Sequence, residues 1–338
     1  MPSNVVIEAI AYELPSQIVT SLSLEEQMSD NLQKFGIPLG SLEMLSGIKE
    51  RRVWDAGTLP STVATIAAKK VIDESGINPD EIGCIINTSV SKDYIEPSVA
   101  CLVHGNLKLS ASCRNYDIGN ACLGFVDGIS TMMMMLESGQ IKYGLVVNGE
   151  SSRLPMEPTM ERMQDPELTM ETFRDNFATL TLGSGAVAMI LTRKENSDSG
   201  HLINGSASLA DTENNLLCVG THEGGITDPQ KLLVAGVALA EKAWKVCERD
   251  LENWSDDSID LYIPHQVSMP HINKLSEALG MSMSKIFLNV QELGNIGPAA
   301  LPITLKMAEE AGRMAPGDHV ALLGIGSGLN CTGMSVTW

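Results

Sequence analysis

Basic residues are scarce in this sequence. Only 23 Lys and Arg stand against 42 Asp and Glu in 338 residues, which gives a formal net charge of −19. A surface this acidic repels phosphate backbones, so we do not expect nucleic acid as a partner. Long apolar runs are missing as well, since none approaches the roughly 20 residues that a membrane span requires. The first residues lack the basic and apolar regions of a secretory leader, so none is expected.

Closely spaced cysteine pairs are also absent. The seven cysteines are odd in number and widely scattered, without a C-x-x-C pair, which argues against both a disulfide framework and a zinc site. We therefore expect no metal and a reducing cytoplasm. Most of these cysteines are expected to be small buried hydrophobes, and only sequence context can single out one with a chemical role.

What the chain does contain is an α/β pattern that repeats. Apolar runs of strand length alternate with helical patterns, which predicts an α/β fold. The offset that places Val90 on Val267 matches these pairs of segments: 79–91 with 255–268, 62–70 with 239–247, Cys122 with Ala299 and, after a slip of one residue, 144–151 with 320–327. Four matches in one order predict two similar halves, 1–195 and 196–338, joined in the polar stretch 194–200. The less apolar segment 152–177 is expected to be an inserted loop or cap.

Cys122 is the cysteine with the most suggestive context. A predicted strand ends near Ile118, a tight turn follows, and a predicted helix begins at the cysteine and runs to Glu137. A thiol at a helix N-terminus faces the positive end of the helix dipole, which is expected to lower its pKa. The turn would also leave backbone N–H groups free to bind an oxyanion. Cys122 is therefore the candidate nucleophile.

Three further segments are expected to meet near Cys122. His265 ends a short apolar strand, and such strand ends face the ligand crevice of α/β sheets. Asn295 lies in a Gly-Asn turn that duplicates the turn of Cys122. The glycine-rich segment 324–328 follows a predicted strand, with no helix or second strand expected after it, which disfavours a dinucleotide loop. Its glycines would let a backbone N–H approach an oxyanion.

These motifs together resemble the thiolase-fold condensing enzymes, and among them the β-ketoacyl synthase III group. The matching segments are Asn-Ala-Cys-Leu-Gly-Phe at 120–125, Pro-His-Gln at 264–266, Leu-Gly-Asn-Ile-Gly at 293–297, Gly-Ile-Gly-Ser-Gly at 324–328, Ser-Gly-Ile-Lys-Glu-Arg-Arg at 46–52 and Leu-Gly-Ser-Gly-Ala at 182–186. The resemblance covers essentially the whole chain. It implies a five-layered αβαβα architecture, with two duplicated halves, and a homodimer.

The resemblance also assigns roles to individual residues. It implies that Cys122 is acylated by a fatty acyl thioester, and that His265 and Asn295 polarise the carbonyl of the second substrate. The N–H groups of Cys122 and Gly326 would hold the oxyanion of the tetrahedral intermediate. Two other residues of the matching segments, Arg51 and Phe125, are expected to bind substrate. Coenzyme A thioesters enter as substrates, and no separate cofactor is expected.

One departure from the usual synthases of this group concerns Glu96. The position before Pro97-Ser98 is typically apolar there and projects across the dimer into the acyl pocket of the partner, whereas this chain has a glutamate. A malonyl substrate forms its carbanion by losing CO2, but a simple acyl thioester must lose an α-proton. A buried glutamate with a raised pKa would be a suitable base. Glu96 resembles the glutamate of the branch that joins two acyl-CoAs head to head in bacterial olefin synthesis.

Three functions remain open at this point. The first is non-decarboxylative Claisen condensation of two fatty acyl-CoAs to a β-keto acid, with Cys122, His265, Asn295 and Glu96 as catalytic residues. The second is a decarboxylating 3-oxoacyl synthase III that takes malonyl groups from an acyl carrier protein. That acidic carrier would need a basic patch, for which Lys49, Arg51 and Arg52 are candidates. The third is a non-catalytic subunit, which the complete Cys, His and Asn set disfavours.

Overall fold

The strands form one hydrogen-bonded row in the computed structural model, which describes residues 3–197, 200–221 and 224–338. Its N-terminal strands are β1 (Val5–Glu13), β4 (Ile82–Asn87), β5 (Arg114–Asp117), β6 (Tyr143–Glu150) and β7 (Gly185–Arg193). The C-terminal strands are β8 (His201–Ala210), β11 (Leu261–Pro264), β12 (His319–Gly326) and β13 (Asn330–Thr337). The order is β11-β12-β13-β8-β1-β7-β6-β4-β5. Only two residue pairs join β1 to β8, so this is where the row divides into two sheets.

The two sheets have the same internal pattern, as the sequence repeat predicts. β4 pairs in parallel with β6, which continues antiparallel through β7 to β1. In the same way β11 pairs in parallel with β12, which continues antiparallel through β13 to β8. An isolated parallel bridge between Tyr262 and Ile286 occupies the place that β5 has beside β4. The predicted boundary at 195/196 falls between β7 and β8; as a domain boundary it stays a prediction, and residues 198–199 of the junction lie outside the described residues.

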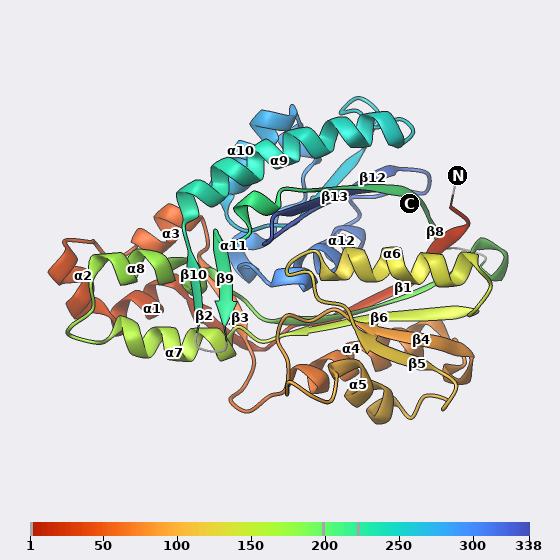
Figure 1. Cartoon of the computed structure of the whole chain (residues 1–338), viewed down its shortest axis with the longest axis horizontal. Coiled ribbons are helices and arrows are strands. Elements are labelled where there is room, and N and C mark those ends of the chain that lie inside the picture. The colour runs from red at the N-terminus through yellow and green to blue at the C-terminus, as the bar shows by residue number, and fades with distance from the viewer. Residues whose placement is uncertain (1–2, 198–199, 222–223) are drawn as a thin grey trace.

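Helices cover the outer faces of both sheets and fill the space between them (Figure 1). One outer layer contains α4 (Pro60–Ser75) and α5 (Val99–Leu107), which pack on the N-terminal sheet through one core cluster. The central layer consists of α6 (Gly124–Glu137) and α12 (Ala300–Glu310), whose apolar residues share a core with both sheets. The other outer layer contains α9 (Pro229–Asp250) and α10 (Met269–Leu279). The result is the αβαβα order of five layers.

The sequence 324–328 forms the end of β12 and the turn that leads into β13, rather than an isolated terminal segment. The expectation that no second strand follows is therefore wrong. The run of β13 is short of large aliphatic residues, with Asn330, Thr332 and Gly333 at its start, and strand propensity there is set by pairing on both sides with β12 and β8. This hairpin places the glycines at the edge where the strands of both sheets end.

Segment 152–177 is helical rather than a loop. It forms α7 (Arg153–Met163) and α8 (Met170–Asn176), which pack against α1 (Ser21–Gln27), α2 (Ser29–Phe35) and α3 (Ser41–Ser46) in a separate cluster (Figure 1). The apolar face of α7 consists of Met156, Met160 and Met163, a helical spacing within an otherwise polar stretch. Low overall apolar content concealed this spacing.

The remaining elements are short. The two-stranded sheets are β2 (Gln17–Thr20) with β3 (Glu50–Val53), and β9 (Cys218–Thr221) with β10 (Gly224–Thr227). The short helices are α11 (Val290–Leu293) and the 3₁₀ turns Pro79–Glu81, Phe177–Thr181, Lys194–Asn196, Thr212–Asn214, Met283–Lys285 and Gly297–Ala299. No helix among the described residues is long and apolar enough to cross a membrane.

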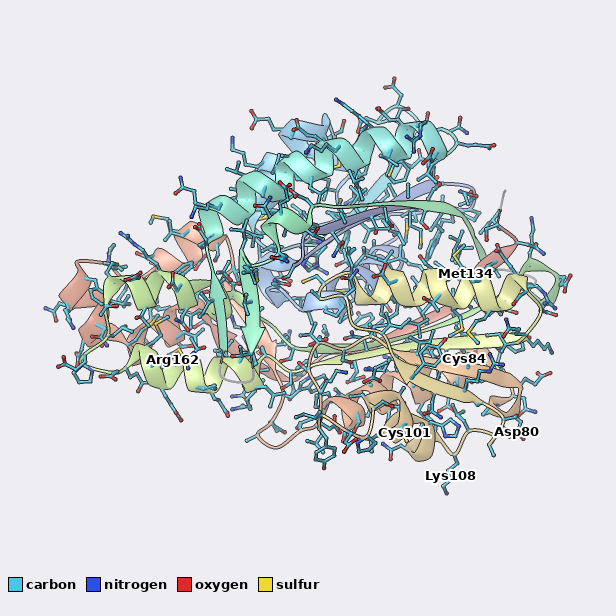
Figure 2. The ribbon with its side chains drawn as sticks, in the orientation of Figure 1. Asp80, Cys84, Cys101, Lys108, Met134 and Arg162 are labelled. Atoms are coloured by element: carbon cyan, nitrogen blue, oxygen red, sulfur yellow. The ribbon has the colours of Figure 1, made fainter. Side chains whose placement is uncertain are left out.

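The four consecutive methionines of α6 provide a test of the central layer. Met132 is fully buried against β6, where a Cβ on Gly144 would lie 2.1 Å from its sulfur, whereas Met134 is 64% exposed (Figure 2). We predict that Met132→Ala lowers the free energy of unfolding by about 2–5 kcal/mol, because it leaves a cavity. Met134→Ala is the control and should change it by less than about 0.5 kcal/mol. Urea unfolding of both variants measures this, and equal losses would contradict the packing described.

Candidate active site

Cys122 lies in a tight turn between β5 and α6. Ala121 has a φ of 46°, which is unusual for a residue with a Cβ and indicates local strain. The turn is held by Asn120, whose amide Nδ2 donates to Asp127 Oδ2 at 2.6 Å and whose Oδ1 accepts from Asn330 Nδ2 at 3.2 Å. Because Asn330 belongs to β13, the C-terminal half helps to fix the turn of the nucleophile. The helix begins at Gly124, two residues later than the sequence predicts.

Gly326 approaches this turn from the end of β12. A Cβ on Gly326 would lie 3.3 Å from the backbone nitrogens of Cys122 and Leu123. Gly324 lies two residues earlier on the same strand, and a Cβ there would lie 2.3 Å from Leu123 Cδ2. The end of β12 therefore approaches the turn of Cys122 closely, and any side chain larger than glycine would be crowded there. The structure brings Gly326 to Cys122 as the oxyanion hypothesis requires.

The thiol of Cys122 does not have the lowered pKa that the helix dipole predicts. Burial raises the pKa of Cys122 to about 12, and the nearby Cys218 and Glu150 add to the rise. The expectation is wrong because the thiol lies before the first helical turn, where the dipole is weak, and because burial disfavours a thiolate. Cys122 is therefore a protonated thiol in this site, and its attack on a thioester requires a group that takes the proton.

His265 follows β11 and is buried, and neither ring nitrogen has a hydrogen-bond partner among the residues that the structure describes. Its backbone N–H donates to Leu323 O of β12 at 2.7 Å, so the strand that carries Gly326 also positions the histidine. Burial lowers the pKa of His265 to about 3, with a contribution from His271. The imidazole is consequently neutral at physiological pH and has one nitrogen to accept a proton and one N–H to donate.

An apolar cavity of about 20 Å³ adjoins His265. Its walls come from α9, α10, β12 and β13 and include Trp244, Trp254 and Leu323. A cavity of this size holds about one water molecule. The surroundings of the histidine are therefore mainly hydrocarbon, which agrees with the lowered pKa of its imidazole.

Asn295 sits in a turn that is locked onto the N-terminal half. Its backbone N–H donates to Thr181 O at 3.0 Å and its carbonyl accepts from Gly183 N at 2.9 Å. A Cβ on Gly183 would lie 1.9 Å from Leu293 O, so this strand-like contact needs glycine. The side-chain Oδ1 accepts from Gly297 N at 2.9 Å. In the described part of the chain the Nδ2 group has no hydrogen-bond partner, and it is free to donate to a ligand.

Contacts link the surroundings of the candidate residues. Gly326 contacts the turn of Cys122, and β12 connects it to His265. A Cβ on Gly297, in the turn of Asn295, would lie 3.9 Å from the carboxyl carbon of Glu150, which itself influences the thiol of Cys122. The arrangement combines a sulfur nucleophile with neutral hydrogen-bond donors, and it suits acyl transfer. Among the described residues there is no cluster of His, Cys, Asp and Glu that could hold a metal ion.

Glu96 differs from expectation within the single chain. It lies on the loop between β4 and α5 and is exposed, not buried as the sequence hypothesis assumed. Its neighbours Tyr94 and Ile95 are 53% and 92% exposed. Three consecutive exposed residues, two of them large and apolar, indicate a surface that another molecule covers. The single chain therefore does not place Glu96 beside its own Cys122.

Arg51 and Phe125 are both buried, and their role in substrate binding stays a prediction. Arg51 is fully buried and donates to Val19 O, Ser21 Oγ and Leu180 O at 3.0–3.2 Å. Burial lowers the pKa of its guanidinium to about 10. Phe125 belongs to the first turn of α6 and is fully buried in the core between the sheets. Arg51 therefore joins elements of the fold, and it cannot contribute to a basic landing patch for a carrier protein.

Glu150 is a site residue that the sequence reasoning missed. It ends β6, it is only 6% exposed, and its two oxygens accept hydrogen bonds from the backbone of Val90 and Ser91 and from the Ser91 hydroxyl. Burial raises the pKa of this carboxyl to about 7, although the hydrogen bonds oppose the rise. The repeat contained a signal, since it aligns Glu150 with Gly326, and both residues end equivalent strands at the site.

Comparison with known proteins identifies the same arrangement elsewhere. The family described as 3-oxoacyl-[acyl-carrier-protein] synthase III matches residues 116–208, and its C-terminal part matches residues 250–338. A protein of Xanthomonas campestris named acyl-CoA:acyl-CoA alkyltransferase is 41% identical over 99% of both chains. A protein of Shewanella oneidensis with the same name is 40% identical, also over 99% of both chains.

A solved structure extends the likeness to three dimensions. The cerulenin-bound OleA of Xanthomonas campestris superposes with a TM-score of 0.98 at 41% identity, covering 100% of this chain and 98% of that one. Sequence identity over the full length and coincidence of the whole fold agree with the cysteine-centred site described above. The chain therefore belongs to the 3-oxoacyl-[acyl-carrier-protein] synthase III family of thiolase-fold acyltransferases.

Proposed function

We propose that this protein joins two fatty acyl-CoA molecules by a Claisen condensation without decarboxylation. The observation that carries the proposal is the close approach of the Gly326 backbone to the turn of Cys122, with His265 bonded to the same strand β12. Full-length relatives named acyl-CoA:acyl-CoA alkyltransferase, at 40–41% identity, support the choice of two acyl-CoAs as substrates. The product is a β-keto acid or its thioester, and the chemistry requires no metal or further cofactor.

The first half-reaction transfers an acyl group to Cys122. The sulfur attacks the thioester carbonyl, and the thiol proton passes to the neutral imidazole of His265 as the new C–S bond forms. The N–H groups of Cys122 and Gly326 stabilise the oxyanion. When the intermediate collapses, the bond to coenzyme A breaks, and the departing thiolate takes the proton back from His265. Because thiol and imidazole both begin neutral, no charge is buried before the substrate enters.

The second half-reaction forms the carbon–carbon bond. The carbonyl oxygen of a second acyl-CoA accepts hydrogen bonds from His265 and the free amide of Asn295. The carboxylate of Glu96 removes an α-proton, and the resulting enolate carbon attacks the acyl-cysteine. The thiolate of Cys122 leaves and takes up the proton that Glu96 removed, which restores both groups. A β-ketoacyl thioester results, and water can hydrolyse it to the β-keto acid and coenzyme A.

We infer that the active unit is a homodimer in which the Glu96 loop of one protomer reaches the site of the other. The exposure of Val90, Tyr94 and Ile95 (58%, 53% and 92%) supports a covered surface here. β5 lies at the edge of the strand row, so it offers backbone groups to a second copy. The seven free cysteines fit a reducing compartment, for which the cytoplasm is our proposal.

The role of Glu96 is tested by Glu96→Gln. We predict that the variant still forms acyl-Cys122 but loses condensation by about 100-fold or more, because removal of a general base typically costs that much. Glu74→Gln, an exposed glutamate on α4, is the control. Intact-protein mass and product mass follow the two steps after mixing with long-chain acyl-CoA alone. Strict dependence on added malonyl thioester, or acylation that survives Cys122→Ala, would refute the proposed function.

The backbone contact at Gly326 is tested by Gly326→Ala. Its methyl group would press on the nitrogens of Cys122 and Leu123 at 3.3 Å and displace the oxyanion donors. We expect the rate of Cys122 acylation to fall about 100-fold, the size seen when one such donor is lost. Gly119→Ala is a matched control, since a Cβ there meets nothing within 4 Å. Rapid-quench mass spectrometry measures the rate; an unchanged rate in Gly326→Ala would exclude Gly326 from the oxyanion site.

A further inference from the structure

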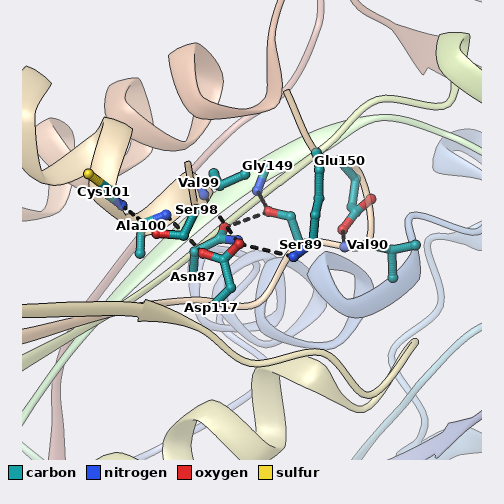
Figure 3. A network of polar contacts seen from close by, with 11 residues as sticks. Asn87, Ser89, Val90, Ser98, Val99, Ala100, Cys101, Asp117, Gly149 and Glu150 are labelled. Carbon is teal, nitrogen blue, oxygen red and sulfur yellow. Dashed lines mark hydrogen bonds and ion pairs between the residues drawn. The ribbon is translucent and has the colours of Figure 1, made fainter. Parts of the chain in front are cut away.

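The loop that carries Glu96 is held at three places by carboxylates, of which Figure 3 shows Glu150 and Asp117. Glu150 accepts from the N–H groups of Val90 and Ser91 at 2.7 and 3.1 Å. In the middle of the loop, Asp93 accepts from the backbone and hydroxyl of Ser61. At its far end, Asp117 accepts from the N–H groups of residues 99 and 100, which open α5, and pairs with Lys92. The tip of the loop at residues 94–96 is left exposed.

Glu150 is the only one of these three carboxylates that also faces the nucleophile. It is near enough to Cys122 to raise the pKa of the thiol, and Gly297 of the Asn295 turn lies against its carboxyl group. Its own backbone is fixed because Trp54 Nε1 donates to Glu150 O at 2.9 Å. One side chain therefore contacts the base loop and the surroundings of both Cys122 and Asn295.

We propose that Glu150 is a positioning residue that sets the Glu96 loop relative to the catalytic centre. This inference rests on the proposed function, in which Glu96 is the base. The two oxygens of Glu150 hold successive N–H groups, Oε1 that of Val90 and Oε2 that of Ser91, so both the position and the direction of the loop are fixed. The Ser91 hydroxyl adds a third bond at 2.7 Å. These three bonds use most of the acceptor positions of the carboxylate, so the proposal assigns Glu150 to holding the loop and Glu96 to proton removal.

In a homodimer this arrangement couples two sites. Glu150 would face Cys122 of its own protomer while it holds the loop that delivers Glu96 to the partner. A displacement of about 1 Å in a catalytic group can cost about 100-fold in rate, so a small change at Val90 and Ser91 is expected to weaken proton removal. Acylation of Cys122 does not use Glu96 and should not depend on this hold.

The test is the isosteric variant Glu150→Gln. The N–H groups of Val90 and Ser91 both need an acceptor. In the variant, the side-chain NH2 group replaces one of the two acceptor oxygens and leaves one of these N–H groups facing a donor. We expect hydrogen exchange at the amides of Val90 and Ser91 to accelerate at least 10-fold, while the amides of residues 99 and 100, held by Asp117, stay unchanged. Condensation in a single turnover should fall at least 10-fold, with Cys122 acylation within threefold of wild type or faster. Glu157→Gln on α7, whose glutamate is 57% exposed, is the control.

A double-mutant cycle separates positioning from general damage to the fold. If Glu150 acts through Glu96, then Glu150→Gln costs nothing further in a Glu96→Gln background. Additive losses, or a parallel loss of acylation, would overturn the inference. Ser91→Ala is a second variant in case Glu150→Gln folds poorly. It removes the hydroxyl's bond to Glu150 together with its two contacts to the Ser151 backbone, keeps both backbone bonds to Glu150, and should give a smaller loss in condensation alone.

Separate measurements test the positioning role of Glu150 and the proposed condensation of two acyl-CoAs. If wild-type protein makes no product from acyl-CoA alone, the proposed condensation fails whatever Glu150 does. The exchange of the Val90 and Ser91 amides is measured without substrate and shows by itself whether Glu150 holds the loop. Unchanged exchange in Glu150→Gln would overturn the inference even if the condensation is confirmed.

Discussion

The contact between Gly326 and the Cys122 turn is the constraint on which the site depends. It brings the backbone at the end of β12 against the turn of Cys122, at a separation where an added methyl group would be tightly crowded at 3.3 Å. Everything around it supports that approach: Asn330 of β13 bonds to Asn120, and α6 and α12 share one core between the sheets. Duplication of an α/β unit therefore has a chemical consequence, since it brings two strand ends to one place and joins a nucleophile to its oxyanion donors.

The site is organised around neutral groups. Burial raises the pKa of Cys122 and lowers that of His265, so neither is charged before a substrate arrives. The two shifts have the same physical cause, because low polarity disfavours thiolate and imidazolium alike. A neutral imidazole and a free amide on Asn295 are suited to stabilise an enolate, whereas a permanent charge would need a compensating partner in the apolar surroundings.

The acidic surplus of the chain contains carboxylates with different tasks. Most are solvent-exposed, but Glu150, Asp93 and Asp117 accept hydrogen bonds from the backbone or hydroxyl groups that frame a single loop. The middle of that loop, at Tyr94 and Ile95 next to Glu96, is exposed and apolar. An exposed tip on a firmly held base is what an interface needs, because the loop keeps its shape before the partner covers it and loses little conformational entropy when it does.

The sequence by itself determined the α/β class and the duplication, and it predicted Cys122, His265 and Asn295 as candidate site residues. These features depend on contiguous motifs and on an offset that recurs along the chain, so they can be predicted without knowledge of tertiary contacts. It also supplied the family resemblance that the comparisons confirmed. It misjudged segment 152–177, because three methionines at helical spacing supply the buried face of α7 where overall composition suggests a loop.

Only the tertiary structure decided which side chains are buried, how burial shifts their pKa values, and which residues distant in the chain are hydrogen-bonded. Arg51 reads as a surface cation until the fold encloses it, and the thiol of Cys122 reads as activated until its burial is known. Glu150 and Val90 are 60 residues apart in the chain, and nothing local to either indicates that they are bonded. The physical reason is the same in each case: pKa and hydrogen bonding depend on which distant groups exclude water from a side chain, and packing of the two halves alone decides that.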